Sequence, residues 1–328
     1  MPCRDRVRGK GPIVEISVGV REVIVAHHQY IGYDLKPAGE LSWTFRASSS
    51  AASWLEKLAL IMQLVPAVRN APRVIYCAKT NRRWDRRMSP VHLLNTFDAS
   101  HIPRVGWTRE DFGSVRLWHH QEIPDVLCEL ESARHYAGEV LQMWYSMQAV
   151  YPGLAKGGGL PLHCALIERE WTGVLLVAGG GHGKSTCCRR LPQPWNALSD
   201  DLALVIPGGE GTFFGHPLPT WSDHMDGRWA ATWNVKRGAP LRGVFFLEQA
   251  NHDKAIPMGQ GQAAIALARS ASYVTTRDGL RRDRAREMRK MFFGNATLLA
   301  RSVPSFTLRV NLNGSFWNEV EHALDGRR

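Results

Sequence analysis

Residues 174–186 read Val-Leu-Leu-Val-Ala-Gly-Gly-Gly-His-Gly-Lys-Ser-Thr, and this stretch decides the fold. An apolar run leads into a glycine loop, which ends in Gly-Lys-Ser where a helix is expected to begin, near Lys184. This order is typical of a P-loop. Glycines let successive backbone N–H groups point inward around a phosphate, and the following helix directs its positive end toward the same anion. The stretch therefore predicts a phosphate-binding strand–loop–helix unit.

The loop predicts ATP and Mg²⁺ as ligands. We expect Lys184 to reach the β- and γ-phosphates and the Ser185 hydroxyl to bind Mg²⁺. The strict P-loop pattern has a glycine where Ala178 stands, and we expect the three glycines that follow to absorb this departure. His182 is expected to be a solvent-facing spacer. The predicted nucleotide-binding residues are Gly179, Gly180, Gly181, His182, Gly183, Lys184, Ser185 and Thr186.

Two adjacent carboxylates, Asp200 and Asp201, follow Lys184 by 16 and 17 residues and precede another apolar run. Like charges at neighbouring positions disfavour joint ionisation unless a cation lies beside them. With Mg²⁺ next to Ser185, one carboxylate would serve the metal and the other would accept a proton from an attacking hydroxyl. The alternative is an exposed Ser-Asp-Asp turn that caps the next element.

The chain around this motif has two halves. Before it, strands are expected at 13–28, 73–78 and 115–118, and helices at 54–68 and 131–150. Tyr-Pro-Gly at 151–153 and three glycines at 157–159 predict a boundary between an N-terminal domain at 1–155 and a catalytic domain at 156–328. After the boundary, strands (160–168, 174–177, 202–206, 212–214, 241–247 and 305–310) alternate with helices (from 184, 263–270, 280–293 and 315–324). This alternation favours an α/β domain with a substantial parallel component.

Composition narrows the class of protein. The chain has 328 residues, 44% of them hydrophobic and 22% charged, which excludes a disordered or fibrous protein. No run of 18 apolar residues and no export signal is present, so we expect a soluble, cytoplasmic protein without a membrane partner. The six cysteines form no C-x-x-C pair, which favours free thiols. A net charge of +11 fits an acidic partner, such as a nucleotide, a nucleic acid or an acidic peptide.

A histidine completes a recognisable order of motifs. His163 precedes Lys184 by 21 residues, with a strand, a turn and a second strand expected between them. The order of histidine, P-loop and aspartate pair resembles the catalytic domain of the HPr kinase/phosphorylase family, whose P-loop fold is similar to that of phosphoenolpyruvate carboxykinase. The resemblance covers about residues 160–320. It implies an α/β fold of that kind, with a smaller mixed α+β domain before it, and an oligomer.

The same resemblance implies roles for the site residues. Asp201 would be the general base toward the acceptor hydroxyl, His163 would assist or orient that base, and Asp200 would lie by the metal. The glycine-rich signature that the bifunctional enzymes carry downstream is absent, so the resemblance extends neither to phosphorylase activity nor to HPr as substrate. The runs at 241–248 and 303–308 look more like a divergent branch, which includes lasso-peptide kinases and the C protein of the SynChlorMet cassette.

These features predict a kinase that phosphorylates a Ser or Thr hydroxyl of a ribosomally made peptide precursor, so that the partner is a peptide or small protein. Two alternatives stay open: a kinase of a small molecule such as free serine or a sugar, and a nucleotide-binding partner protein of a peptide-maturation complex. Within 281–290, Arg282, Arg286 and Arg289 share one helical face, which is either a solvated surface or a contact for an acidic peptide or phosphate. The basic stretch 79–87 lacks a recognised nucleic-acid-binding motif, and a plain basic loop is the preferred interpretation.

Overall fold

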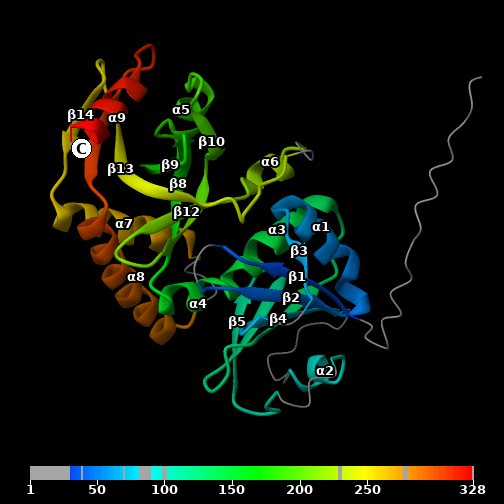
Figure 1. Ribbon diagram of the computed structural model, residues 1–328. Helices are drawn as coiled ribbons and strands as arrows, with labels where there is room; N and C mark the ends of the chain where they lie inside the picture. The colour runs from blue at the N-terminus through cyan, green and yellow to red at the C-terminus, as the bar shows by residue number, and fades with distance from the viewer. Residues whose placement is uncertain are drawn as a thin grey trace, which may run out of the picture.

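The protein is a mixed α/β molecule with two mixed sheets (Figure 1). The structure is a computed structural model, and it describes residues 30–37, 40–68, 71–80, 90–97, 102–227, 231–275 and 280–326. The strands predicted at 13–28 lie outside these residues. The first sheet takes its strands from residues 31–131 and the second from residues 160–310.

The first sheet has seven strands in the order β3-β1-β2-β4-β7-β6-β5. The pairs β2–β4 and β4–β7 are parallel and the others antiparallel. Its strands are β1 (Ile31–Leu35), β2 (Trp43–Ala47), β3 (Val65–Pro66), β4 (Val74–Thr80), β5 (Trp107–Phe112), β6 (Val115–His120) and β7 (Val126–Glu131). The helices of this half are α1 (Ala52–Met62), the short α2 (Val91–Leu94) and α3 (Tyr136–Ser146), with short 3-10 turns at Ser49–Ala51 and Met147–Ala149.

Helices cover this sheet on both faces, which explains why its central strand is apolar throughout. On β4, Ile75 and Cys77 belong to the large core that includes α1 and α3, whereas Val74 and Tyr76 pack in a separate cluster with α2. Successive side chains of a strand point to opposite faces, so a strand buried on both faces reads as a continuous apolar run. Figure 1 shows α1 and α3 on one side of the strands and α2 on the other.

The second sheet has eight strands, five of which close on themselves. The pairs β8–β11, β11–β12, β12–β13, β13–β9 and β9–β8 form this ring, while β10 extends from β8, and β15 and then β14 extend from β13. The strands are β8 (Leu160–Arg169), β9 (Thr172–Val177), β10 (Asn196–Ser199), β11 (Leu202–Pro207), β12 (Phe213–Leu218), β13 (Ala239–Gln249), β14 (Lys254–Pro257) and β15 (Ser305–Val310). Among the described pairs of this sheet, the parallel ones are β9–β13 and β15–β13. The parallel component is therefore smaller than the alternation of elements predicts.

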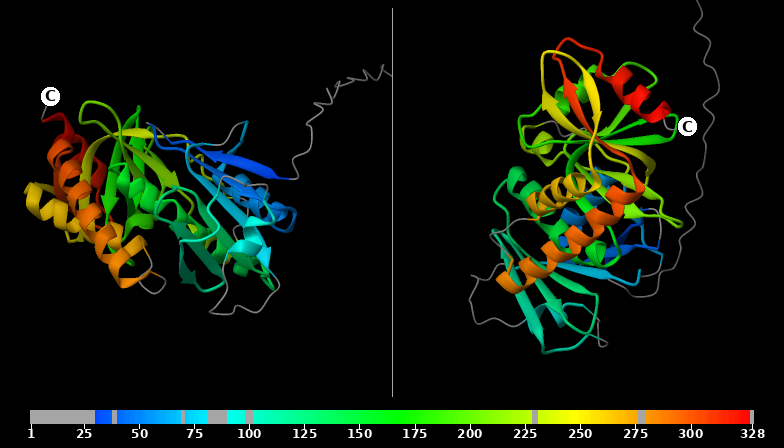
Figure 2. Two further views of the ribbon diagram at one scale, coloured as in Figure 1. Left: turned by 90° about the horizontal axis from the view of Figure 1, so that it is seen from below. Right: turned by 90° about the vertical axis from the view of Figure 1, so that its left-hand side faces the viewer.

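Four helices enclose the second sheet. Helices α7 (Gln260–Val274) and α8 (Arg282–Ser302) pack side by side on one flank (Figures 1 and 2). Helices α5 (Lys184–Arg190) and α9 (Phe316–Asp325) take part in the apolar cluster on the other face. The alternation along β8 divides the strand between the two cores, with Leu166 facing the first and Ile167 the second.

Three predictions about local structure are corrected by the packing. The helix expected at 54–68 ends at Met62, because Gln63 takes left-handed backbone angles and the chain then enters β3. The helix expected from 131 begins only at Tyr136, since Glu131 still pairs in β7 and residues 132–135 connect that strand to the helix. The break expected at 151–153 is the start of α4 (Tyr151–Lys156), whose first turn accommodates Pro152.

The predicted domain boundary after residue 155 falls inside α4. The largest apolar cluster takes residues from both sides of it, from Leu35 to Val303, and the Asn295 amide of α8 donates to the carbonyls of Ala155 and Gly159 at 2.8 and 3.0 Å. The division into two domains stays a prediction. Among the described helices, none is long and apolar enough to cross a membrane.

Candidate functional site

The register of β8 explains how His163 and the aspartate pair come together. Strands β10 and β11 both run along β8, with Ser199 opposite Leu166 and Leu202 opposite His163. Asp200 and Asp201 are the two residues between these strands, and the Cys164 N–H donates to the Asp201 carbonyl at 3.0 Å. The pair therefore lies between two strands that run along β8, beside His163.

The glycine loop connects β9 to α5, as the sequence predicts. Gly181 and Gly183 have φ angles of 74° and 95°, which an L side chain rarely adopts. A Cβ added at Gly180, Gly181 or Gly183 would meet no other atom within 4 Å, so these positions face open space. The Gly181 carbonyl accepts from the Gln249 amide at 3.4 Å, and the exposed His182 ring hydrogen-bonds the Gly180 carbonyl at 2.8 Å through Nδ1. The loop thus has the open, glycine-dependent shape of a cradle.

Lys184 is buried and turned into this loop, with 6% of its surface exposed. Its ammonium donates to the carbonyls of Ala178 and Gly179 at 3.1 and 3.2 Å and lies 3.0 Å from His163 Nε2. Within the described part of the chain, no carboxylate lies within salt-bridge distance of it. Burial lowers the pKa of Lys184, and the nearby charge of Asp201 acts in the opposite direction. A buried cation whose direct partners are two carbonyls and an imidazole is poorly compensated, which favours binding of an anion at this position.

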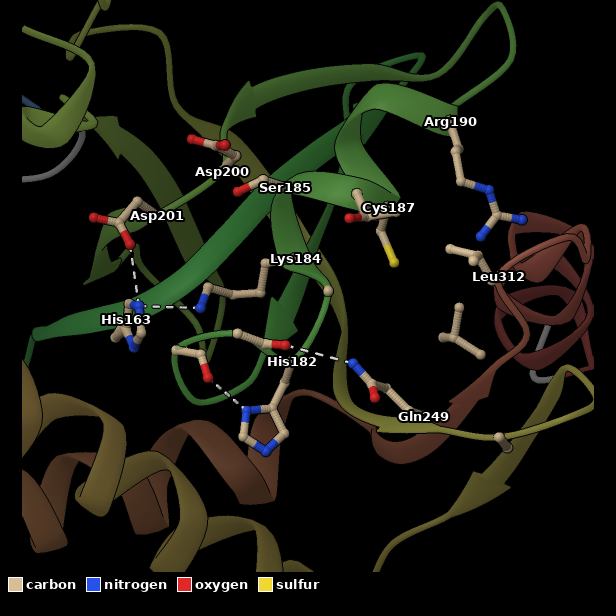
Figure 3. Close-up of a pocket in the computed structure, with 16 residues that line it drawn as sticks. His163, His182, Lys184, Ser185, Cys187, Arg190, Asp200, Asp201, Gln249 and Leu312 are labelled. Atoms are coloured by element: carbon tan, nitrogen blue, oxygen red, sulfur yellow. Dashed lines mark hydrogen bonds and ion pairs between the residues drawn. The ribbon is translucent and has the colours of Figure 1, made fainter. Parts of the chain in front are cut away.

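His163 connects Lys184 to Asp201 (Figure 3). Its Nε2 lies 3.0 Å from Asp201 Oδ1 and 3.0 Å from the Lys184 ammonium. One nitrogen holds one proton or none, so Nε2 either donates to Asp201 or accepts from Lys184. Asp201 is the accessible end of this chain, with 36% of its side chain exposed against 9% for His163.

Two residues that the sequence analysis missed hold the histidine in place. Ser270 of α7 accepts from the His163 N–H at 3.0 Å, and its hydroxyl lies 3.2 Å from the His163 carbonyl. The Tyr273 ring, one turn further along α7, stacks on the imidazole with a centroid distance of 4.7 Å and an interplanar angle of 22°. Both lie more than 100 residues from His163 in sequence, so no local pattern reports them.

Asp200 is fixed by a different partner. The buried Thr220 hydroxyl donates to Asp200 Oδ1 at 2.6 Å, a contact that the sequence analysis also missed. Ser185 and both aspartates line one cavity, whereas the described residues contain no group of three His, Cys, Asp or Glu side chains that could hold a metal by themselves. Mg²⁺ commonly takes one or two carboxylates and completes its shell with phosphate oxygens and water. The donor set of Ser185 and Asp200 fits this requirement.

The cavity has a volume of about 550 Å³, within the range of small-molecule sites. Of the predicted residues, Gly179 alone does not line it, and its carbonyl instead holds Lys184. Figure 3 shows Lys184, His163 and Asp201 at one end, with Arg190, Gln249 and Leu312 at the other. The lining adds residues that carried no sequence signal: Cys187, Arg190, Gln249, Ala250, Val310 and Leu312.

The basic features lie elsewhere. On α8, Arg284 is engaged by the buried Glu110 at 3.1 Å and by His119, while Arg289 lines a second hollow between α7 and α8. Arg282 and Arg286 are exposed. In the stretch 79–87, residues 81–87 lie outside the described part of the chain, and Lys79 pairs with Glu139 at 3.3 Å.

Comparison with known proteins identifies the family. No curated protein matches the chain. Residues 126–325, which include the glycine loop, His163 and both aspartates, match the family described as SynChlorMet cassette protein ScmC. This match covers more than half of the 328 residues. The chain therefore belongs to the ScmC family.

Proposed function

We propose that this protein is an ATP-dependent kinase that transfers the γ-phosphoryl group to a Ser or Thr hydroxyl of a ribosomally made peptide. The observation that carries the proposal is the buried Lys184 ammonium, which among the described residues contacts two carbonyls and His163 but no carboxylate, and is linked through His163 to the exposed end of Asp201. A phosphate in the glycine loop would supply the missing negative charge. Asp201 would then lie at the mouth of the same cavity as a proton acceptor.

The residues divide the work of phosphoryl transfer among them. Ser185 and Asp200 would hold Mg²⁺, which when bound neutralises charge on the phosphates. Lys184 would exchange its carbonyl contacts for phosphate oxygens, and the open positions at Gly180 and Gly183 leave room for them. Catalysis by positioning and charge neutralisation needs little else from the protein.

Proton transfer falls to Asp201 and His163. Asp201 would take the proton from the acceptor hydroxyl as the oxygen attacks phosphorus. In the tautomer that carries a proton on Nε2, His163 donates to Asp201 and holds the carboxylate toward the cavity. When Lys184 turns to a phosphate, His163 Nε2 loses its second partner, which favours this tautomer.

A peptide acceptor is favoured by the family. The chain belongs to a family of cassette proteins, and its resemblance to proteins of peptide-modification systems supports a peptide over a free metabolite. Asp201 is partly exposed rather than enclosed, so a side chain presented by a larger substrate can reach it. A small-molecule kinase remains the alternative that the acceptor test distinguishes.

The test measures Mg·ATP affinity and phosphoryl transfer on the same proteins. The acceptors are synthetic peptides that contain Ser or Thr, including any short peptide found to be encoded beside the gene, their Ser-to-Ala and Thr-to-Ala forms, and free serine. We expect a mass gain of one phosphate on a peptide, and Asp201→Asn should slow it by about 10² to 10⁴ while nucleotide affinity changes little. Glu170→Gln is the control, because it removes one negative charge, as Asp201→Asn does, but in an exposed hairpin turn. Transfer by Asp201→Asn at the parental rate, or tight Mg·ATP binding without transfer to any acceptor, would contradict the proposal.

A further inference from the structure

A second hollow, of about 720 Å³, lies along the outer faces of α7 and α8. We call it the α7–α8 groove and define it by Ile265, Arg269, Tyr273, Arg289 and Phe293. The α7 members follow one another at intervals of four residues, as do the two on α8, so each helix contributes one continuous stripe. The groove stripe of α7 is distinct from its core stripe, which includes Ala264, Leu267 and Ala271.

The groove is more apolar than an ordinary helix surface. Tyr273, Phe293 and Ile265 leave 70%, 52% and 47% of their surface exposed. Single exposed apolar side chains are common, but three that line one hollow mark a surface that binds something. Because α7 already has an apolar face packed against the core, folding does not require this second stripe.

The groove adjoins the candidate active site. Tyr273 lines the groove, His163 lines the nucleotide cavity, and their rings stack at 4.7 Å. A chain lying in the groove would therefore pass directly beside the residue that contacts Asp201. The Tyr273 end of the groove therefore lies nearest to His163 and Asp201, where the acceptor hydroxyl would bind.

The groove also carries positive charge. Arg269 on α7 and Arg289 on α8 are exposed, and among the described residues neither forms an ion pair with a carboxylate. Arg284, on the same helix as Arg289, is in contrast neutralised by Glu110. Two arginines beside exposed aromatic rings complement a ligand that is both apolar and acidic.

We infer that the α7–α8 groove binds the acceptor peptide next to the phosphorylated residue, and that it selects an acidic, aromatic-containing segment. This inference rests on the proposed function. At 1.5 Å per residue of helix, Arg269 lies about 6 Å and Ile265 about 12 Å from Tyr273 along α7. An extended peptide rises about 3.3 Å per residue. The segment would place an aromatic residue on Tyr273, a carboxylate about two residues further and an apolar residue about four residues further.

The test uses two fluorescein-labelled peptides and fluorescence anisotropy at low ionic strength. The acidic probe has one serine, an adjacent phenylalanine, glutamates two residues beyond it and a terminal leucine, and the basic probe has lysines in place of the glutamates. The parent should bind the acidic probe more tightly. The double variant Arg269→Glu/Arg289→Glu should weaken that binding by about tenfold. Lys290→Glu changes charge by the same amount as Arg289→Glu, at a neighbouring exposed position outside the groove, and should have less than about a twofold effect.

A ring test complements the charge test. Tyr273→Ala should lower the affinity for the acidic probe, whereas Tyr273→Phe, which keeps the ring, should retain most of it. Thermal unfolding of each variant verifies that the protein is folded. Equal affinity of the parent for both probes, or equal effects of Arg289→Glu and Lys290→Glu, would overturn the inference. So would a change in the sedimentation of the double variant without a change in probe affinity, because the groove would then be a contact between copies of the chain.

The two proposals fail separately. If a peptide is phosphorylated at a rate that does not respond to the groove substitutions, the kinase proposal stands and the peptide-binding role of the groove is contradicted. If the parent binds the acidic probe tightly through the arginines but transfers no phosphate, the kinase proposal is contradicted and the groove stands as a peptide-binding site.

Discussion

The first sheet and the glycine loop both contain buried charge, but they compensate it in different ways. In the first sheet, Glu129 is fully buried, accepts from Arg116 at 3.2 Å and Trp118 at 3.4 Å, and lies 3.2 Å from His92. In the glycine loop, Lys184 is nearly as buried, and its partners among the described residues are two carbonyls and His163. The charge of Glu129 is paired within the protein and so belongs to the folded structure. The charge of Lys184 is held by carbonyl dipoles and is therefore available to a ligand.

The difference makes stability and ligand binding separable. Removing one partner of a buried ion pair typically costs about 3–5 kcal/mol, because the other charge stays buried and uncompensated. Removing a lone buried cation has no such cost, since the residue was desolvated without an ionised partner. The two regions should therefore respond oppositely to truncation.

The largest effect is expected at Lys184. Lys184→Ala should abolish detectable ATP binding and turnover, because Arg190, the arginine that lines the cavity, lies at its other end and donates to the carbonyls of Asn311 and Gly314. Its free energy of unfolding should stay within about 1 kcal/mol of the parent or rise. Isothermal titration with Mg·ATP and urea unfolding measure the two quantities on one preparation, with Lys254→Ala, at an exposed position on β14, as the control. Parental ATP turnover by Lys184→Ala would show that the loop is not a nucleotide site.

The reverse result is expected in the first sheet. Glu129→Ala should destabilise the protein by about 3–5 kcal/mol, because the buried Arg116 loses its fully buried carboxylate partner. The Mg·ATP affinity of the folded fraction should not change. Glu131→Ala removes an exposed carboxylate two residues further along β7 and should cost less than about 1 kcal/mol. Equal urea midpoints for the two variants would mean that the buried pairs contribute nothing beyond surface ion pairs.

The sequence predicts the site far better than its surroundings. The P-loop pattern is local, so its strand, loop and helix appear where the chemistry of residues 174–186 puts them. His163 and the aspartate pair were found through spacing and family resemblance, and they meet because β8 pairs with β11 across that spacing. The roles assigned to these residues stay predictions.

What the sequence could not predict depends on contacts between distant segments. Thr220, Ser270 and Tyr273 act on the site through hydrogen bonds and stacking that only the folded chain creates. Glu131, where the sequence predicts the start of a helix, ends β7 instead, because β4 and β6 offer this segment hydrogen bonds on both sides. Long-range pairing thus overrides local propensity where a segment lies inside a sheet.

A buried histidine, His216, extends the comparison to the pH dependence of stability. Burial lowers the pKa of His216 from 6.5 to about 4, although its Nδ1 bonds the Val235 carbonyl at 3.0 Å. Between pH 6.5 and 4, His216 binds a proton in the unfolded chain but not in the folded protein. Its contribution to the free energy of unfolding is therefore complete above pH 6.5 and decreases as the pH is lowered toward 4. A shift of this size corresponds to about 3 kcal/mol.

Urea unfolding across this pH range measures the effect. His216→Leu should unfold with a shallower loss of stability between pH 6.5 and 4 than the parent, whatever its stability at pH 7. His252→Leu, at an exposed position, should keep the parental slope. Identical slopes for His216→Leu and the parent would show that His216 titrates normally in the folded state.

The smallest effect is expected where a neutral group adjusts a charged one. The Thr220 hydroxyl donates to one oxygen of Asp200 at 2.6 Å, which orients the carboxylate, and Asp200 lines the same cavity as Ser185. Thr220→Val keeps the shape of the side chain and removes only the donor. Partners of this kind typically contribute tenfold or more to metal affinity, so the Mg²⁺ concentration for half-maximal transfer should rise by about tenfold. Transfer at saturating Mg²⁺ and the affinity for ATP without metal should stay near parental values, because Lys184 and the loop are untouched. Thr297→Val, which removes an exposed hydroxyl that bonds its own helix, is the control and should change neither quantity. A reduced rate at saturating Mg²⁺ with an unchanged half-saturation would place Thr220 with the reacting groups instead, and the division between paired structural charge and available site charge would then have to include the hydroxyl.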